Sequence, residues 1–266
     1  MTFAARNLPA KALAENYASK KACMNTFLLE LCAESLNTAL AAERGGADRI
    51  ELCDQLKIGG VTPGERLTAT VVHALSIPVH VLIRPRGGAF FYTTGEFDQM
   101  REQVKWAKKA GAGGVVLGVL RADGCIDVDR SQELVELARP MKVTFHRAFD
   151  ATPDLGEALE AVIETGADCL LTSAGAPNVL SGVEELGRLV RQARGRIQIM
   201  AGGGLKLASM LEVLERTGVR CLHGSLARRD GENGNGSRAA IEAENLEADV
   251  RTAVHLLRGH FAAQMI

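Results

Sequence analysis

The sequence alternates between short apolar runs rich in β-branched residues and longer segments with amphipathic, helical periodicity. Each apolar run is bounded by Gly, Pro or polar turn residues, as strands usually are. Strands that alternate with helices are typical of repeated βα units with a parallel sheet. After Met24 the pattern predicts eight strands, over residues 27–31, 49–53, 79–84, 115–119, 143–145, 169–172, 197–201 and 220–223.

A repeated turn precedes every second strand of this series. It reads GADRIEL at 46–52, GAGGVVL at 111–117, GADCLLT at 166–172 and GVRCLHG at 218–224. We expect each first glycine to end a helix in the left-handed conformation, which a residue without Cβ adopts at little cost. A two-unit period repeated four times favours one closed TIM-type (β/α)8 barrel of the α/β class. An open doubly wound sheet is the weaker alternative, because no GxGxxG follows the first strand.

The helix signals divide the chain into an extension and one domain. Ser35 is the expected N-cap of the first helix, and Gly45 and Gly46 end it. We expect residues 1–23 to be a disordered extension, with a weak amphipathic targeting helix as the alternative. Residues 24–266 then form the barrel domain, with a polar loop near 229–237 before a last helix over about 238–257.

Composition and charge exclude several partner classes. Of 266 residues, 47% are hydrophobic and 24% charged, and 31 Lys and Arg against 32 Asp and Glu give a net charge of −1. Without a basic face, nucleic acid is not an expected partner. No apolar run approaches the ~18 residues of a membrane span. The six cysteines form no CxxC pair, so we expect reduced thiols and a cytoplasmic protein.

Charged residues inside apolar strands indicate which side chains point into the barrel. Because strand side chains alternate, Glu30 and Cys32 should point inward while their neighbours pack under helices, and Glu51 and Cys53 should do the same. The same phase places Glu30, Glu51, Arg84, His146 and His223 at one mouth. Buried charges are costly unless paired, so these residues indicate a functional pocket. A rigid internal network, in which Glu30 and Glu51 neutralise Arg84 and Arg86, is the alternative.

Glycine-rich strand ends add a candidate anion site. AGGG at 201–204 and HGS at 223–225 follow the seventh and eighth strands, where many barrels bind phosphate through backbone N–H groups. In IRPRGG the two arginines could hold a carboxylate or phosphate. The candidate anion-binding residues are Arg84, Arg86, Ser173, Gly202, Gly203, Gly204, Gly224 and Ser225. Alternatively, the glycines serve only as tight turns.

The duplicated Glu-Leu-Cys is the candidate metal site. Cys32 and Cys53 occupy matching positions on adjacent strands about 4.8 Å apart, so one soft ion could bridge two inward thiols. Cu(I) accepts thiolate ligands, whereas zinc would have to recruit further donors. Alternatively, both cysteines are small buried hydrophobes, or the stagger of the strands separates their sulfurs.

Long strings in the chain resemble the CutC family, described as copper homeostasis proteins. They are ELC, GGADRIELC, GGVTP, IRPRGG, VTFHRAFD, LTSAGAP, IMAGGG and HGS, and the resemblance covers about residues 24–227. It implies a TIM-type barrel, a cytoplasmic location, a homodimer or higher homo-oligomer, and Cu(I) binding. The family's proposed ligands fall on Cys32 and Cys53.

Three hypotheses follow. In the first, Cys32 and Cys53 bind Cu(I), and Glu30, Glu51 and His146 surround the ion. In the second, the same mouth is an enzyme site for a small phosphorylated or carboxylated anion. Its candidate catalytic residues are Glu30, Glu51, Arg84 and His146, with protons moved by His146 and a glutamate. No organic cofactor is indicated. The third is a purely structural barrel whose mouth binds nothing.

Overall fold

The fold is known from a computed structural model, which describes residues 27–226 and 236–263. The predicted extension over 1–23 and most of the predicted polar loop near 229–237 lie outside these described residues. The predicted last helix lies within α9, which runs from Gly236 to Ala263.

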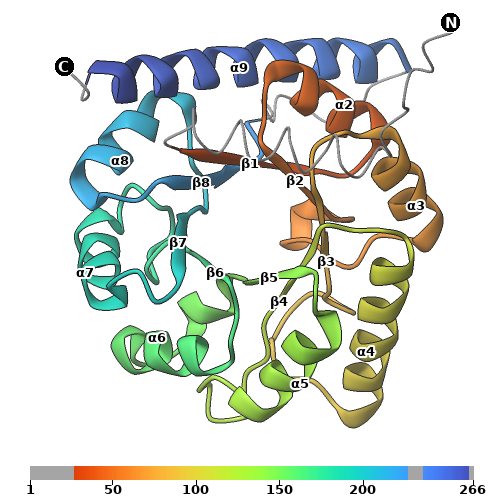
Figure 1. The fold of residues 1–266 in the computed structure, drawn as a ribbon, viewed down its shortest axis with the longest axis vertical. Helices are drawn as coiled ribbons and strands as arrows, with labels where there is room; N and C mark the ends of the chain where they lie inside the picture. The colour runs from red at the N-terminus through yellow and green to blue at the C-terminus, as the bar shows by residue number, and fades with distance from the viewer. Residues whose placement is uncertain (1–26, 227–235, 264–266) are drawn as a thin grey trace, which may run out of the picture.

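The strands form one closed parallel barrel, which confirms the predicted (β/α)8 architecture (Figure 1). Neighbours in the sequence are neighbours in the barrel, and β1 closes it against β8. Every predicted run overlaps its strand. The strands are β1 (Leu28–Ala33), β2 (Arg49–Leu52), β3 (Val79–Leu82), β4 (Gly114–Leu117), β5 (Lys142–Phe145), β6 (Cys169–Thr172), β7 (Gln198–Ala201) and β8 (Cys221–Gly224).

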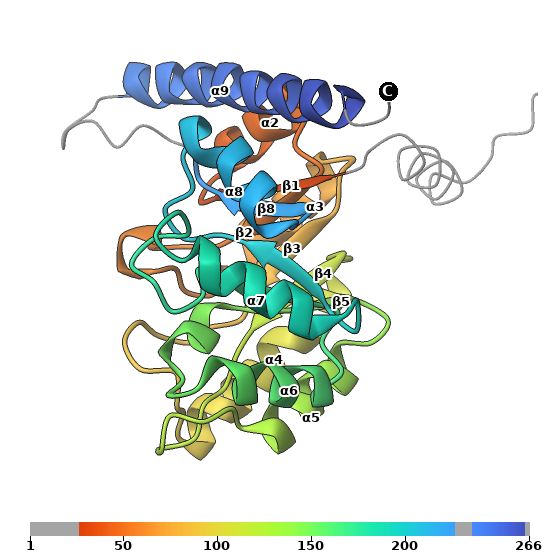
Figure 2. The same cartoon turned by 90° about the vertical axis from the view of Figure 1, so that its left-hand side faces the viewer.

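Helices surround the barrel, and the long α9 lies across α2 and beside α8 (Figures 1 and 2). The α-helices are α2 (Leu36–Gly45), α3 (Glu65–Ala74), α4 (Thr94–Lys109), α5 (Val128–Ala138), α6 (Leu155–Glu164), α7 (Val183–Ala193), α8 (Met210–Thr217) and α9. Short 3₁₀ turns follow three strands, at η1 (Leu56–Ile58), η2 (Arg147–Ala151) and η3 (Leu207–Ser209).

The predicted helix boundaries are confirmed at the repeated turns. Ser35 caps α2 in a capping box with Thr38, and Gly46 ends it. The first glycines of the four repeated turns all have positive φ: Gly46 100°, Gly111 84°, Gly166 77° and Gly218 75°. A left-handed residue after each helix turns the chain into the next strand, which explains the period of the sequence.

The core has two parts. Outward strand residues such as Leu29, Leu31 and Ile50 are fully buried under the helices. Inside the barrel, the strand register stacks inward side chains in layers from alternate strands, as in TIM barrels. One layer holds Glu30, His80, Thr144 and Met200, and the layer above it holds Glu51, Val116, Leu171 and His223. Polar residues therefore occupy the barrel axis on the β1–β3 and β8 side.

Within the described residues, no helix has the length and apolar character that crossing a membrane requires.

Candidate functional site at the barrel mouth

A cavity of about 230 Å³ opens at the carboxyl ends of the strands. This is the end at which TIM barrels carry their active sites. Of the residues predicted at the mouth, Cys32, Glu51, Arg84, His146 and His223 line the cavity. It is also lined by Leu56, Gly59, Leu82, Phe90, Arg147, Leu171, Gly203, Gly204, Leu205, Gly224 and Ser225.

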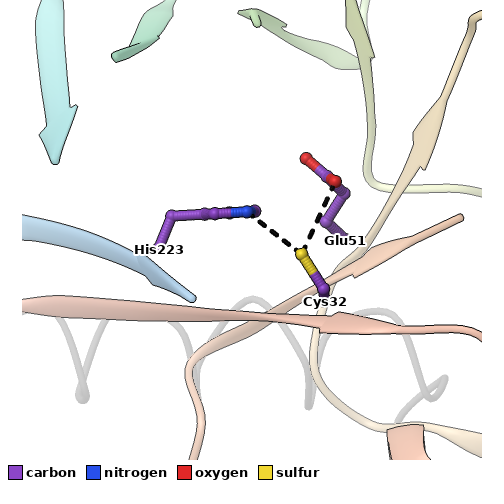
Figure 3. Close-up of side chains that lie close together, drawn as sticks. All are labelled: Cys32, Glu51 and His223. Atoms are coloured by element: carbon purple, nitrogen blue, oxygen red, sulfur yellow. Dashed lines mark hydrogen bonds between the residues drawn. The ribbon is translucent and has the colours of Figure 1, made fainter. Parts of the chain in front are cut away.

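Three donor side chains converge on one point of this mouth. The Cys32 Sγ lies 3.1 Å from Nε2 of His223 and 3.8 Å from Oε1 of Glu51 (Figure 3). One ligand atom from each residue lies within 4.8 Å of the others, so the group could hold a metal ion. All three side chains are buried. They come from β1, β2 and β8, which barrel closure makes adjacent.

Glu30 orients the histidine of this cluster from below. The fully buried carboxylate accepts a hydrogen bond from the Arg49 guanidinium and lies 2.7 Å from Nδ1 of His223. Burial alone would raise the pKa of Glu30, but the Arg49 charge and the His223 contact hold it far below its usual value. Glu30 is therefore an anion whose charge is matched inside the barrel, rather than a free base at the mouth.

The environment shifts the pKa values of the three converging groups in the same direction. Burial, reinforced by Glu51, raises the pKa of the Cys32 thiol well above its usual value. Burial also raises the pKa of Glu51, against the opposing effect of His223. For His223, burial lowers the pKa, but the Glu51 and Glu30 carboxylates outweigh it and raise the pKa above its ordinary value. Each shift favours the protonated form of its group when no cation is bound.

Cys53 lies in different surroundings from Cys32. The register pairs Cys32 with Glu51, so Cys53 stands one inward position further along its strand. Cys53 is fully buried and packs with Leu82 and Val116. Among the described residues it is not in the converging donor group. The sequence pattern places His223 at the mouth, but it does not predict the contact between His223 and Cys32.

Arg84, which follows β3, carries a buried positive charge in the same cavity. Its guanidinium donates to the carbonyl oxygens of Gly60 at 2.9 Å and Gly88 at 2.8 Å, and it packs over the Phe90 ring. Within the described part of the chain, it forms no ion pair with a carboxylate. The predicted neutralisation of Arg84 by Glu30 or Glu51 is therefore not seen: Glu30 pairs with Arg49 instead.

His146 is held in one orientation by the backbone. It precedes η2, and its Nδ1 accepts a hydrogen bond from the Ala148 N–H at 3.2 Å. Its buried Nε2 has no hydrogen-bond partner among the described residues. Burial, followed by the nearby Arg84 charge, lowers the pKa of His146 to about 3. Gly118 lets the ring lie against the backbone, because a Cβ there would come within 2.5 Å of Nδ1.

The other predicted anion-binding residues separate into two groups. Gly203, Gly204, Gly224 and Ser225 line the cavity, whereas Arg86, Ser173 and Gly202 do not appear in its lining. Arg86 forms an ion pair with Glu96, with 2.5 Å between Nε and Oε1, and its guanidinium stacks on the Tyr92 ring. The Ser173 hydroxyl donates a hydrogen bond to Asp150 and accepts one from Arg147. Gly202 packs against the side chains of Leu171 and His223. These three therefore support neighbouring residues.

Comparison with known proteins identifies the family. The profile of the CutC family matches residues 27–228. The chain belongs to the CutC family. A human relative, "Copper homeostasis protein cutC homolog" from Homo sapiens, is 43% identical over 204 residues, covering 77% of this chain and 75% of its own. A CutC family protein from Chromobacterium violaceum is 44% identical over 198 residues, covering 74% of this chain and 80% of its own.

A solved CutC structure confirms the fold at the family level. The crystal structure of the putative copper homeostasis protein CutC from Streptococcus agalactiae superposes with a TM-score of 0.71 at 30% sequence identity, covering 75% of this chain and 98% of that one. The cavity residues all fall within the stretch that matches the CutC family.

Proposed function

We propose that this CutC protein handles copper by binding Cu(I) at the barrel mouth, with Cys32 and His223 as ligands. The observation that carries the proposal is the convergence of the Cys32 thiol, the His223 imidazole and the Glu51 carboxylate within 4.8 Å. Thiolates are the soft ligands that select Cu(I), and imidazole also suits copper. The copper homeostasis relatives support this assignment.

Binding of Cu(I) would have to displace protons from this cluster. The pKa of Cys32 is raised by burial and by Glu51, so the thiol is protonated before the metal arrives. Metal competes with that proton, and the Cu(I) affinity should therefore rise with pH, by about tenfold per pH unit for one displaced proton. Measuring the affinity between pH 6 and 8 tests this, and an affinity independent of pH would argue against a thiolate ligand.

The ligand set is tested by Cu(I) titration against a strong competing chelator. We expect Cys32→Ser to lose affinity strongly, and Cys125→Ser, which removes a partly exposed thiol elsewhere, to bind like the wild type. The sequence-based pairing of Cys32 with Cys53 stays a prediction, and Cys53→Ser tests it separately. Wild-type affinity in the Cys32→Ser/Cys53→Ser double variant would overturn the copper proposal.

A second candidate function is an enzyme acting on a small anionic metabolite. It is favoured by the buried charge of Arg84, which has no carboxylate partner among the described residues and lines the same cavity as Glu51 and His223. Those two groups could transfer protons to or from a bound molecule. Screening phosphorylated and carboxylated metabolites for thermal stabilisation and then for turnover tests it; a Glu51→Gln variant with unchanged turnover would contradict the catalytic role. The expected cytoplasmic location and homo-oligomeric state stay predictions.

A further inference from the structure

We propose that the mouth contains a binding site for a small monocarboxylate, held between the Arg84 guanidinium and the Nε2–H of His146. The inference deepens the second candidate function by naming the class of ligand. It concerns binding alone, so it can be tested without turnover and without copper.

Arg84 supplies a buried cation that has no counter-ion among the residues that the structure describes. Its side chain is almost fully buried, with 4% of the residue exposed. The groups that hold it are neutral: the carbonyls of Gly60 and Gly88, and the face of Phe90 at 4.6 Å from the guanidinium carbon. Carbonyl groups orient the guanidinium but leave its charge unmatched. A buried charge without a partner is costly, so the cavity beside it favours an anion.

His146 supplies a neutral hydrogen-bond donor whose tautomer is fixed by the backbone. Because Nδ1 accepts the Ala148 N–H, it carries no proton, and the proton of the neutral ring lies on Nε2. That Nε2 is buried and has no hydrogen-bond partner in the described part of the chain, and the ring lines the cavity. His146 therefore acts as a hydrogen-bond donor toward a ligand, whereas the sequence suggested that it moves protons together with a glutamate.

The two donors share one wall of the cavity. The Phe90 ring packs against the His146 ring, with centroids 5.0 Å apart, and also against Arg84. This aromatic surface keeps water from the two N–H donors and strengthens their bonds to a ligand. A carboxylate placed between Arg84 and His146 could accept a hydrogen bond from each of them with its two oxygens.

Charge balance selects a carboxylate over a phosphate. Arg84 offers one positive charge without a partner, and a carboxylate carries one negative charge. A phosphate monoester carries about −1.5 to −2 at neutral pH, and its excess charge would lie in the cavity that Glu51 also lines. Any negative charge on Glu51 would add to this excess, because its buried Oε2 has no hydrogen-bond partner among the described residues. The cavity of about 230 Å³ restricts the ligand to a small molecule.

The site is tested by titrating the metal-free, full-length protein with propionate, propionamide and inorganic phosphate, followed by protein NMR. Propionamide has nearly the shape of propionate without its charge. We expect propionate to saturate the mouth resonances and to bind at least about tenfold more tightly than either other probe. In the unliganded protein, the ¹⁵N shifts of His146 should show the proton on Nε2.

Variants locate the site. Arg84→Gln should weaken propionate binding by about tenfold or more, whereas Arg86→Gln, a matched change of an arginine that is paired with Glu96, should not alter it. His146→Asn retains an acceptor for the Ala148 N–H but loses the distal donor, so it should weaken binding several-fold. His146→Gln places an amide donor near the Nε2 position and should restore it.

Several results would overturn the proposal. They are no saturable propionate binding by the folded wild type, tighter binding of phosphate than of propionate, or equal propionate affinity in Arg84→Gln. A proton found on Nδ1 of His146 would also overturn it, and this measurement does not depend on any variant folding. Carboxylate binding without turnover of any substrate would refute the second candidate function alone, so the two failures are distinguishable.

Discussion

Glu30 is fully buried at the barrel axis, and its carboxylate is shared by Arg49 and His223. A buried carboxylate stays charged at an acceptable cost only while its partners are present. Removing one partner leaves the other charge buried without compensation, which costs more free energy than the intact pair contributes to stability. Arg49 itself is almost as buried as Glu30. The pair therefore fixes the position of His223, but it stabilises the fold only when both Glu30 and Arg49 are present.

This arrangement predicts strong coupling between Arg49 and Glu30. Arg49→Met alone should lower the free energy of unfolding by about 3–5 kcal/mol, because it leaves the buried Glu30 carboxylate without its arginine partner. The double variant Glu30→Leu/Arg49→Met should recover most of that loss, since both charges of the pair are then removed together. Urea unfolding of the wild type, both single variants and the double variant measures the coupling. Additive losses in the double variant would show that the pair does not act as a unit.

A second residue-scale prediction concerns pH and His146. Its pKa lies near 3 in the folded protein against an ordinary value of 6.5, through burial and the Arg84 charge. Between these values the unfolded chain binds a proton that the folded protein excludes, so stability falls as pH drops below 6.5. His146→Asn should remove about 1.4 kcal/mol per pH unit from that slope. Unfolding measured between pH 5 and 6.5 tests this, and an unchanged slope contradicts it.

At the scale of elements, the contact between α2 and α9 depends on one glycine. A Cβ at Gly45 would lie 2.6 Å from Cβ of Val250 and 2.9 Å from the Glu247 carbonyl oxygen. Backbone would have to move to make room, so Gly45→Ala should destabilise the protein by about 1–3 kcal/mol. Gly259→Ala, on the open side of α9, should stabilise it by about 0.5–1 kcal/mol through helix propensity.

Thermal or urea unfolding of these two alanine variants checks the prediction. Both changes add one methyl group to a helix, so they differ only in what surrounds the new Cβ. If Gly45→Ala proved neutral or stabilising, α9 would not pack closely against α2 in solution.

The elements themselves could be predicted because their signals are local. Alternation of apolar runs, the cap at Ser35 and the left-handed glycines after helices each depend on a few neighbouring residues, and all are seen in the structure. The inward phase of Glu30 and Glu51 was predictable for the same reason, since side chains alternate along a strand.

Contacts between strands could not be predicted in the same way, because they depend on register. Equal positions in two Glu-Leu-Cys strings suggested that Cys32 faces Cys53, but the stagger of the barrel pairs Cys32 with Glu51. The contact of Cys32 with His223 joins residues 191 positions apart and exists only once β8 closes against β1. The hydrogen bond from the Ala148 N–H to His146 Nδ1, which fixes the tautomer, could not be predicted from sequence either, because it depends on the turn that η2 makes.

At the scale of the whole molecule, a nearly neutral chain carries an uneven arrangement of charge inside its barrel. Cys32 and His223 lie beside Glu51 on the β1, β2 and β8 side, while Arg84 and His146 come from the ends of β3 and β5. One cavity therefore presents two kinds of chemistry, a soft donor pair and a pair of anion-directed donors. A closed barrel makes this combination natural, because each strand end contributes separately to one mouth.

The last prediction is that these two halves of the mouth can be disabled separately. Cys32→Ser should abolish tight Cu(I) binding while leaving propionate affinity within about twofold of the wild type. Among the described residues, the Cys32 side chain contacts Glu51 and His223, and residues that share no partners act additively. Arg84→Gln should show the opposite pattern. Chelator competition and NMR titration on the same four samples, including the wild type and the double variant, measure both affinities. If Cys32→Ser lost both ligands, a single site would have to bind both, and the division of the mouth into two halves would be wrong.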